Sequence, residues 1–224
     1  STSGSNRCKN VSSGASHING TVLYPGEEFS AYETVSPFTE ANGYAMAGSY
    51  LNGEVVDSMG GGICQVSTTL YNAVLRAELN VTERSPHSMT VHYVDLSEDA
   101  AIAGTYKDFK FVNSTEYPIY IEGYTTSDKK ITFNIYGKET RDKNRTISFE
   151  SQMVSETPAT TILQEDAGQG IGYKAVSSKG SSGYVAELYK IVKVNGVETD
   201  RIKVNKSTYK GTNRVVTYGT AGDP

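Results

Sequence analysis

Cys64 is the residue of this 224-residue chain whose surroundings point most clearly to chemistry. Gly60, Gly61 and Gly62 come directly before Ile63, and the apolar spacing that follows predicts that a helix begins at Ile63 and has Cys64 in its first turn. A thiol in the first turn of a helix lies near unpaired backbone N–H groups and the positive end of the helix dipole, which both stabilise a thiolate. The pattern indicates a cysteine nucleophile, and a small buried thiol is the alternative interpretation.

The residues next to Cys64 are candidates for binding a substrate. Gly61 and Gly62 carry no side chain, so a substrate carbonyl can approach their backbone closely. The amides that open the helix can hold a developing oxyanion, and Gln65 either donates to it or fills the first turn. Ser67 lies beside Cys64 on a helical wheel, off the apolar stripe. Cys64 is therefore not placed as core filler.

A cysteine nucleophile needs a base, and the chain has three histidines. His87 is the preferred candidate because it lies in a loop after the helix, from which it can reach the start of the helix. His92 falls five residues later in a predicted strand, so the two rings would point to opposite faces and at most one would face Cys64. His17, in a Ser/Gly-rich segment, is the least favoured.

A working base also needs a partner that orients its imidazole. Asp99, Ser88 or a backbone carbonyl can fill this role, and the sequence does not choose among them. Ser88 is in addition a candidate substrate contact. Arg84 can bind a substrate carboxylate as a bidentate fork, although an ion pair with Glu83 or Glu78 is an equal alternative.

The elements that must position these residues are one helix and several strands. The helix is predicted over residues 63–79, and alternating residues predict four later strands, at 90–94, 107–112, 118–124 and 130–136, with a hairpin turn at Asp128-Lys129. Residues 18–50 look like short strands broken by turns. The expected fold class is α+β, with one main helix packed on an antiparallel sheet and a smaller all-β part behind it.

A polar, charged stretch without periodicity at residues 139–145 predicts a linker between two domains, residues 1–138 and 146–220. The second domain contains several β-branched or Tyr-rich runs, at 146–154, 184–194, 198–204 and 214–218. Asn195-Gly196 predicts a hairpin turn between two of them. Residues 166–183 hold five glycines and are expected to be mainly loop.

Composition excludes several function classes. Residues 1–140 hold 9 Lys/Arg against 16 Asp/Glu and residues 141–224 hold 12 against 9, so neither part is basic enough for a nucleic-acid partner. Two cysteines make no disulfide framework or zinc site, and no metal or cofactor is expected. A Cys8–Cys64 disulfide is possible but has no geometric support. No apolar run reaches the ~20 residues of a membrane segment, and the Ser/Gly-rich start is no signal peptide.

Several long motifs occur in an order that resembles the VanW-like family over residues 6–138. They are GGGICQVSTTLYNAVLRAEL, ERSPHSMTVHYV, EDAAIAG and DFKFVNSTEYPIYI, with LYPGEEFSAYETVSPFTEANGY upstream. Residues 145–220, with spaced glycines, a VNGVE hairpin and a TYKGTNRVVTYGT ending, look like a G-five domain. The chain lacks the short His-Gly-Cys signature of the better-known L,D-transpeptidases.

The resemblance implies an exported, cell-wall-associated protein of Gram-positive bacteria, usually tethered by an N-terminal membrane segment outside this chain. VanW-like domains are associated with vancomycin-resistance clusters, and some are regarded as L,D-transpeptidases that form 3-3 cross-links between peptidoglycan stem peptides. On this chain that activity would depend on Cys64 and His87. The G-five resemblance implies binding to a polymer that contains N-acetylglucosamine. The alternative function is a non-catalytic peptidoglycan-binding or scaffolding protein.

Overall fold

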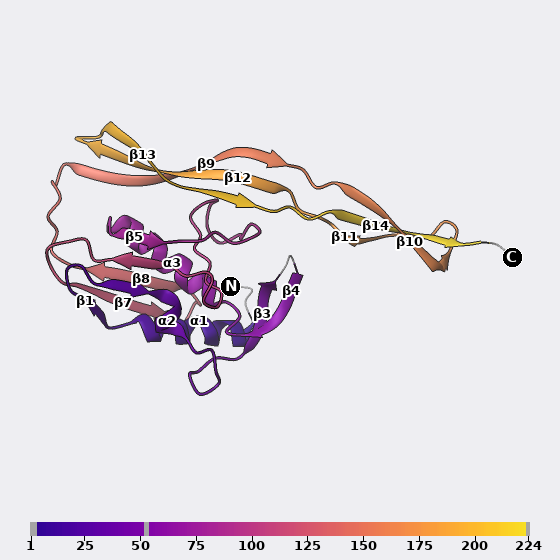
Figure 1. The fold of residues 1–224 in the computed structure, drawn as a ribbon, viewed down its shortest axis with the longest axis horizontal. Helices are drawn as coiled ribbons and strands as arrows, with labels where there is room; N and C mark the ends of the chain where they lie inside the picture. The colour runs from indigo at the N-terminus through magenta and orange to yellow at the C-terminus, as the bar shows by residue number, and fades with distance from the viewer. Residues whose placement is uncertain (1–3, 52–53, 223–224) are drawn as a thin grey trace.

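The computed structural model describes residues 4–51 and 54–222 and has two parts, an N-terminal α+β body and a long C-terminal β ribbon (Figure 1). The body contains three helices, α1 (Ser5–Ile18), α2 (Ala31–Val35) and α3 (Ile63–Arg76). Helices pack against antiparallel sheets in the body, and the C-terminal part is all β. The predicted fold class is therefore confirmed.

The body contains three small antiparallel sheets. One has the order β1 (Thr21–Leu23), β7 (Ile119–Thr125) and β8 (Ile131–Tyr136). A second has the order β2 (Glu28–Ser30), β6 (Lys110–Val112) and β5 (Asn80–Glu83), and the third is the pair β3 (Met46–Leu51) and β4 (Glu54–Met59). The hairpin predicted between β7 and β8 is present, with Lys129 at φ 64° in the turn.

Helix α3 forms where the apolar spacing predicts it and occupies the centre of the core. Ile63, Val66, Leu70 and Val74 are buried along its apolar stripe. A second face of the same helix, with Ser67, Thr68 and Tyr71, is buried as well. Because these residues include polar groups, this second face must be covered by segments that offer hydrogen-bond partners.

Helix α1 is the main element that sequence patterning missed, because serines and a glycine give its sequence a low helix propensity. Packing overrides this preference. Gly14 lies against α3, where a Cβ would come within 3.1 Å of Val66 and would overlap Ile63. The glycine therefore allows α1 to approach α3 closely, and Ala15 and Ile18 are buried beside it.

The strand predicted at 90–94 is wrong, because residues 84–102 form an irregular loop that crosses the second face of α3. The backbone amide of Ala101 donates to the carbonyl of Ser85 at 2.8 Å and closes the two ends of this 84–102 loop. Thr68 and Ser67 both donate to the carbonyl of Ala100. The backbone of the loop thus pairs with side chains of α3 in place of a neighbouring strand.

The C-terminal ribbon consists of two sheets in series (Figure 1). The first has the antiparallel order β13 (Val197–Tyr209), β12 (Gly183–Val194) and β9 (Arg145–Thr157). The second has the order β10 (Thr161–Gly170), β14 (Arg214–Ala221) and β11 (Lys174–Ser178), with β10 parallel to β14. The Asn195-Gly196 hairpin is confirmed, since both residues have positive φ between β12 and β13.

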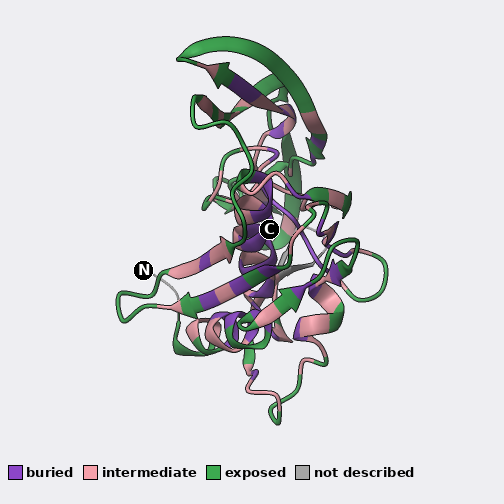
Figure 2. Cartoon of the chain, turned by 90° about the vertical axis from the view of Figure 1, so that its left-hand side faces the viewer, coloured by how far each residue is buried: buried purple, intermediate pink, exposed green. Residues whose placement is uncertain are grey.

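The expectation that residues 166–183 are mainly loop is wrong. They contain the end of β10 and all of β11, and both strands pair with β14. Most side chains of these strands are exposed, as Figure 2 shows for much of the ribbon, so the strands bury too little apolar surface to leave an alternating pattern. Their backbone hydrogen bonds hold the sheet together.

The first sheet of the ribbon lies against the body, and a partly buried acid joins the two parts. Leu188 of β12 is fully buried and belongs to the same apolar core as α3. Glu78 lies just after α3. Its carboxylate oxygens accept hydrogen bonds from the side chains of Arg145 at 2.7 Å, Lys190 at 3.0 Å and Arg141 at 3.2 Å. The hydrogen bond from Arg145 outweighs the effect of burial and lowers the pKa of Glu78 to about 2.

We predict that Glu78→Gln lowers the free energy of unfolding at pH 7 by on the order of 2–3 kcal/mol. The folded-state pKa of Glu78 is below its unfolded value, so its stabilisation is complete above pH ~4.3 and is lost as the pH falls toward about 2. Urea unfolding at pH 7 and pH 3 measures the difference. Glu139→Gln removes an exposed partner of Arg141 and is the matched control, with little effect. An equal loss at both pH values for Glu78→Gln would contradict the assignment.

Candidate active site

Cys64 lies in the first turn of α3, as the sequence predicts. The turn before it is formed by Gly62, whose φ of 108° favours glycine. The thiol is partly buried and donates to the carbonyl of Ile102 at 3.3 Å. Within the described part of the chain, no backbone carbonyl accepts from the Cys64 amide, so this N–H can stabilise negative charge next to the sulfur.

The 84–102 loop brings His87 and Asp99 to the thiol. His87 Nδ1 lies 2.7 Å from Asp99 Oδ2, and the backbone amide of His87 donates to the same oxygen at 2.7 Å. The His87 side chain also interacts with Cys64 closely enough to lower the pKa of the thiol. The carboxylate fixes both the backbone and the ring of His87, and a nucleophile, an imidazole and a carboxylate are connected in sequence.

These contacts set the charges of the site. Burial alone would raise the pKa of the Cys64 thiol, but the interaction with His87 and its charge, together with the charge of Lys107, lower it overall. Burial opposes protonation of His87, but hydrogen bonds to Asp99 and Cys64 outweigh burial and raise its pKa to about 9. These interactions favour the charged pair, a thiolate and an imidazolium, over the neutral pair.

Asp99 is the centre of a buried polar cluster. Its side chain is 1% exposed. Oδ2 faces His87, whereas Oδ1 accepts from Arg84 Nη2 at 2.9 Å and from the Tyr209 hydroxyl at 2.6 Å. Burial would raise the pKa of Asp99, but the hydrogen bonds from His87 and Tyr209 and the charge of Arg84 hold it below its usual value. A buried carboxylate with this many donors stays ionised.

Arg84 is not placed to bind a substrate carboxylate, which corrects that expectation. Its side chain is 6% exposed, and its donors are directed inside the protein. Nε donates to the backbone carbonyl of Asp99 at 2.7 Å and Nη1 donates to Ser207 Oγ at 2.8 Å. The alternative ion pairs with Glu83 and Glu78 do not form either, because Glu83 pairs with Lys110 and Glu78 pairs with basic residues near the linker.

Three further candidate substrate contacts have structural partners. Ser67 is 1% exposed and donates to the carbonyl of Ala100 at 2.7 Å, so it anchors the 84–102 loop and cannot reach a substrate. Gln65 Oε1 accepts from Arg7 Nη2 at 3.1 Å, which ties α1 to the first turn of α3. Ser88 is exposed, and its carbonyl accepts from the amide of Lys210 at 2.7 Å. Asp99, not Ser88, is the group that contacts the His87 ring.

The glycines before Cys64 are required by packing. A Cβ on Gly61 would lie 2.5 Å from the carbonyl carbon of Ala47 and would overlap the oxygen, so the face of Gly61 that lacks a side chain is filled by β3. Arg7 covers Gly62, and a Cβ added to Gly62 would lie 2.9 Å from the Cγ of Arg7. Other parts of the protein therefore occupy the side of each glycine where a Cβ would lie, and the role of their backbone in binding a substrate stays a prediction.

The remaining histidines lie outside the cluster. His92 is exposed in the 84–102 loop, so the argument from opposite strand faces does not apply. His17 ends α1, where its Nδ1 lies 2.8 Å from the carbonyl of Ser13 and its ring stacks on Tyr44. Cys8 and Cys64 form no disulfide with each other.

Sequence patterning missed three residues near the thiol. Tyr93 lies with its ring 6.5 Å from that of His87, edge to face, and burial together with the nearby Cys64 charge raises its pKa. Lys107 donates to the carbonyl of Pro86 at 3.1 Å and adds positive charge to the site. Tyr209, far away in the sequence, contacts Asp99. The short motifs around His87 and Asp99 gave no signal for these long-range contacts.

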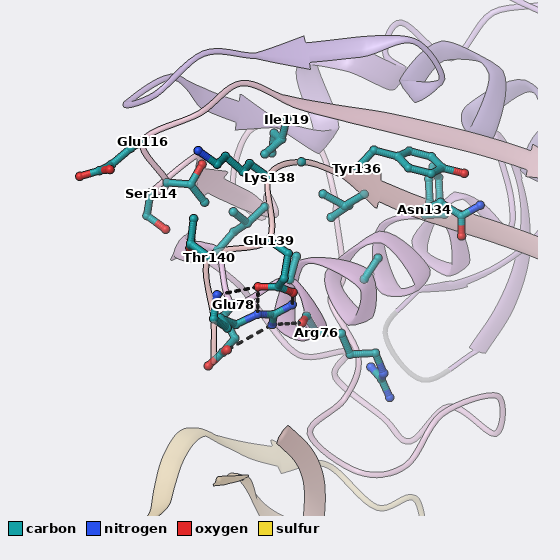
Figure 3. Close-up of a pocket in the computed structure, with 18 of the residues that line it drawn as sticks. Arg76, Glu78, Ser114, Glu116, Ile119, Asn134, Tyr136, Lys138, Glu139 and Thr140 are labelled. Atoms are coloured by element: carbon teal, nitrogen blue, oxygen red, sulfur yellow. Dashed lines mark hydrogen bonds and ion pairs between the residues drawn. The ribbon is translucent and has the colours of Figure 1, made fainter. Parts of the chain in front are cut away.

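A cavity of about 910 Å³ lies elsewhere, between the end of α3, β8 and the linker (Figure 3). Two acids of its lining that Figure 3 labels, Glu78 and Glu139, both form ion pairs with Arg141. None of the site residues lines it. Among the described residues, no group of three His, Cys, Asp or Glu side chains could hold a metal ion, and no helix is long and apolar enough to cross a membrane.

Comparison with protein families matches residues 6–136 to the VanW-like proteins and residues 149–221 to the G5 domain. The first match covers more than half of the chain and contains Cys64, His87 and Asp99. The chain belongs to the VanW-like family. A VanW-like domain followed by a G5 domain indicates a protein associated with the cell wall.

Two curated relatives match the VanW-like part. The uncharacterized protein YoaR of Bacillus subtilis (strain 168) is 40% identical over 119 residues, which are 53% of this chain and 39% of that protein. The vancomycin B-type resistance protein VanW of Enterococcus faecalis (strain ATCC 700802 / V583) is 29% identical over 138 residues, 58% of this chain and 49% of that protein. The match spans less than half of either relative.

Among solved structures, the G5 domain of an IgA1 protease is 24% identical, covers 37% of this chain and 98% of that chain, and has a TM-score of 0.26. The HP0197 G5 structure is 20% identical, covers 34% of this chain and 97% of that chain, and has a TM-score of 0.22.

We predict that Gly61→Ala lowers the free energy of unfolding by about 1–3 kcal/mol, because the added methyl must displace the backbone of β3. Thermal unfolding measures the change. Gly170→Ala is the matched control, since a Cβ there meets nothing within 4 Å, and its effect is expected within about 0.5 kcal/mol. Equal stability of Gly61→Ala and the parent protein would show that the loop has room for a side chain.

We also predict that iodoacetamide alkylates Cys64 with a pH midpoint below the ~8.5 of an ordinary thiol. The lowered pKa means that thiolate is present at a pH where an ordinary thiol is still protonated. In His87→Ala the midpoint moves up, because the imidazolium charge and its hydrogen bond are lost. Peptide mass spectrometry separates Cys64 from Cys8. His92→Ala is the control and keeps the parent profile, and an unchanged midpoint in His87→Ala would contradict the ion pair.

Proposed function

We propose that this protein is a cysteine-dependent L,D-transpeptidase that forms 3-3 cross-links between peptidoglycan stem peptides. The observation that carries the proposal is the connected series of Cys64, His87 and buried Asp99 at the start of α3. Such a series is what acyl transfer through a thioester needs. The VanW-like and G5 domains support a substrate in the cell wall.

In the first half of the reaction, Cys64 Sγ attacks the carbonyl between the third and fourth residues of a donor stem peptide. The proton that the thiol has already given to His87 passes to the leaving amine, so the C–N bond breaks and D-alanine is released while the C–S bond forms. The Cys64 amide stabilises the oxyanion of the tetrahedral intermediate. Asp99 keeps the ring of His87 in place throughout.

In the second half, a side-chain amine of an acceptor stem attacks the thioester carbonyl. His87, now neutral, takes a proton from this amine, the C–S bond breaks, and the thiolate and imidazolium are restored. The ring of Tyr93 lies edge to face with that of His87, 6.5 Å away, where it could limit access of water. Exclusion of water favours transfer to the amine over hydrolysis.

The C-terminal ribbon is proposed to bind a wall polymer that contains N-acetylglucosamine. Several apolar side chains of its second sheet and of the turn between β10 and β11 are exposed, among them Leu163, Ile171 and Tyr173, and such side chains can pack against sugar rings. With 12 Lys/Arg against 9 Asp/Glu in residues 141–224, the ribbon is not repelled by anionic polymers.

The test of the catalytic proposal incubates the protein with disaccharide-tetrapeptide and follows dimer and released D-alanine by mass spectrometry. We expect both products with the parent protein, none with Cys64→Ala, and a loss of about 10²-fold or more with His87→Ala, since general acid–base catalysis typically contributes 10²–10⁴-fold. His92→Ala, an exposed histidine of the same loop, keeps most of the activity.

Two outcomes would overturn the proposal. Products that persist in Cys64→Ala would mean that the thiol is not the nucleophile. Binding of the tetrapeptide without dimer or D-alanine, unchanged in Cys64→Ala, would favour the alternative function, a non-catalytic peptidoglycan-binding or scaffolding protein that holds a stem-peptide carboxylate at the start of α3.

A further inference from the structure

Strand β13 of the C-terminal ribbon supplies three side chains to the support of the candidate active site. Alternate residues of a strand point to one face, and three such residues, Asn205, Ser207 and Tyr209, all bond to the N-terminal body. Asn205 Nδ2 donates to the hydroxyl of Tyr71 at 2.8 Å, and Ser207 accepts from Arg84 at 2.8 Å. The contacts continue into Lys210, whose amide donates to Ser88.

Tyr209 makes the contact nearest to the reacting groups. Its side chain is buried, with 3% of the residue exposed. The hydroxyl donates to Asp99 Oδ1 at 2.6 Å and accepts from the amide of Ser97 at 2.7 Å. Asp99 is itself bonded to His87 through the other oxygen. Only Asp99 and His87 therefore separate the phenol of the ribbon from Cys64.

Ser97 shows that the ribbon also holds the backbone of the 84–102 loop. Its φ of 69° is in the left-handed region, which is uncommon for a residue with a side chain. Its hydroxyl donates to the carbonyl of Ala186 in β12 at 3.0 Å, and its carbonyl accepts from Asn205 at 3.0 Å. With the Tyr209 contact, the ribbon satisfies the amide, hydroxyl and carbonyl of this one residue.

We propose that Tyr209 is a positioning residue for the Cys64–His87–Asp99 series, and that the candidate active site of the VanW-like domain is completed by the G5 domain of the same chain. The proposal deepens the proposed transpeptidase function and depends on it only for its kinetic readout. Tyr209 fixes the rotation of the Asp99 carboxylate, which then sets the ring of His87 toward the thiol.

Loss of the Tyr209 hydroxyl has consequences at both of its partners. Asp99 Oδ1 keeps the hydrogen bond from Arg84 but loses the one from Tyr209. The buried amide of Ser97 loses its acceptor. A buried polar group without a partner is costly, so the loop is expected to shift to satisfy it. A shift of Asp99 carries the His87 ring away from Cys64, and the thiol then titrates closer to an ordinary cysteine.

The test uses Tyr209→Phe in the full chain and the pH profile of Cys64 alkylation by iodoacetamide, a readout that needs no substrate. We expect the midpoint to rise by about one pH unit or more, with circular dichroism unchanged. With the tetrapeptide substrate, kcat should fall about tenfold or more, with KM within about twofold. Tyr218→Phe is the matched control, because the Tyr218 hydroxyl donates to Glu165 at 2.8 Å in the second sheet of the ribbon. This variant is expected to keep the pH profile of the parent protein.

Ser207→Ala is the second variant. It removes the hydroxyl that accepts a hydrogen bond from Arg84 and keeps Tyr209. It therefore tests the same contact between ribbon and body if Tyr209→Phe does not fold. A smaller rise in the midpoint is expected. If the folded variants had the same alkylation midpoint as the parent protein, the positioning role would be overturned. The low midpoint of the parent protein itself would not be affected by that result. Failure of the transpeptidase proposal is different, because the parent protein would then make no dimer although the midpoint still rose in Tyr209→Phe.

Discussion

The site depends on the burial of one carboxylate, that of Asp99. An ionised carboxyl that is 1% exposed is stable only when its oxygens are saturated by donors, and here His87, Arg84 and Tyr209 supply them. The same bonds that keep Asp99 charged also fix the His87 ring. Because the positive imidazole lies against Cys64, the charge buried at Asp99 is transmitted to the thiol as a lowered pKa. Structure and reactivity at this site are thus consequences of one desolvated charge.

Local sequence patterns predicted the parts of this arrangement that local physics determines. Glycines followed by an apolar stripe located the start of α3 and put Cys64 in its first turn, and a loop histidine after a helix identified His87. Asp99 was one of several partners that the sequence left open. Helix α1 was missed because its serines and Gly14 disfavour a helix in isolation, whereas close packing on α3 requires a residue without a side chain there.

The sequence could not predict contacts that form only when distant segments meet. Arg84 and Ser67 have the chemistry of substrate-binding residues, but burial against Asp99 and Ala100 assigns them to the support of the site. Tyr209 is more than one hundred positions from Asp99, in a part of the chain whose pattern shows only a strand. The two domains are separable as sequence motifs, yet they share a core through Leu188 and a polar cluster through Tyr209.

The most direct measurement of the central claim is the protonation of His87, read from the nitrogen chemical shifts of its ring in ¹⁵N-labelled protein, with the signal assigned through His87→Ala. The account predicts that both ring nitrogens carry a proton at pH 7.5 and that Cys64→Ser, which removes the thiolate, lowers the pKa of His87. A neutral His87 ring at pH 7.5 in the parent protein, with a pKa that Cys64→Ser leaves unchanged, would contradict it.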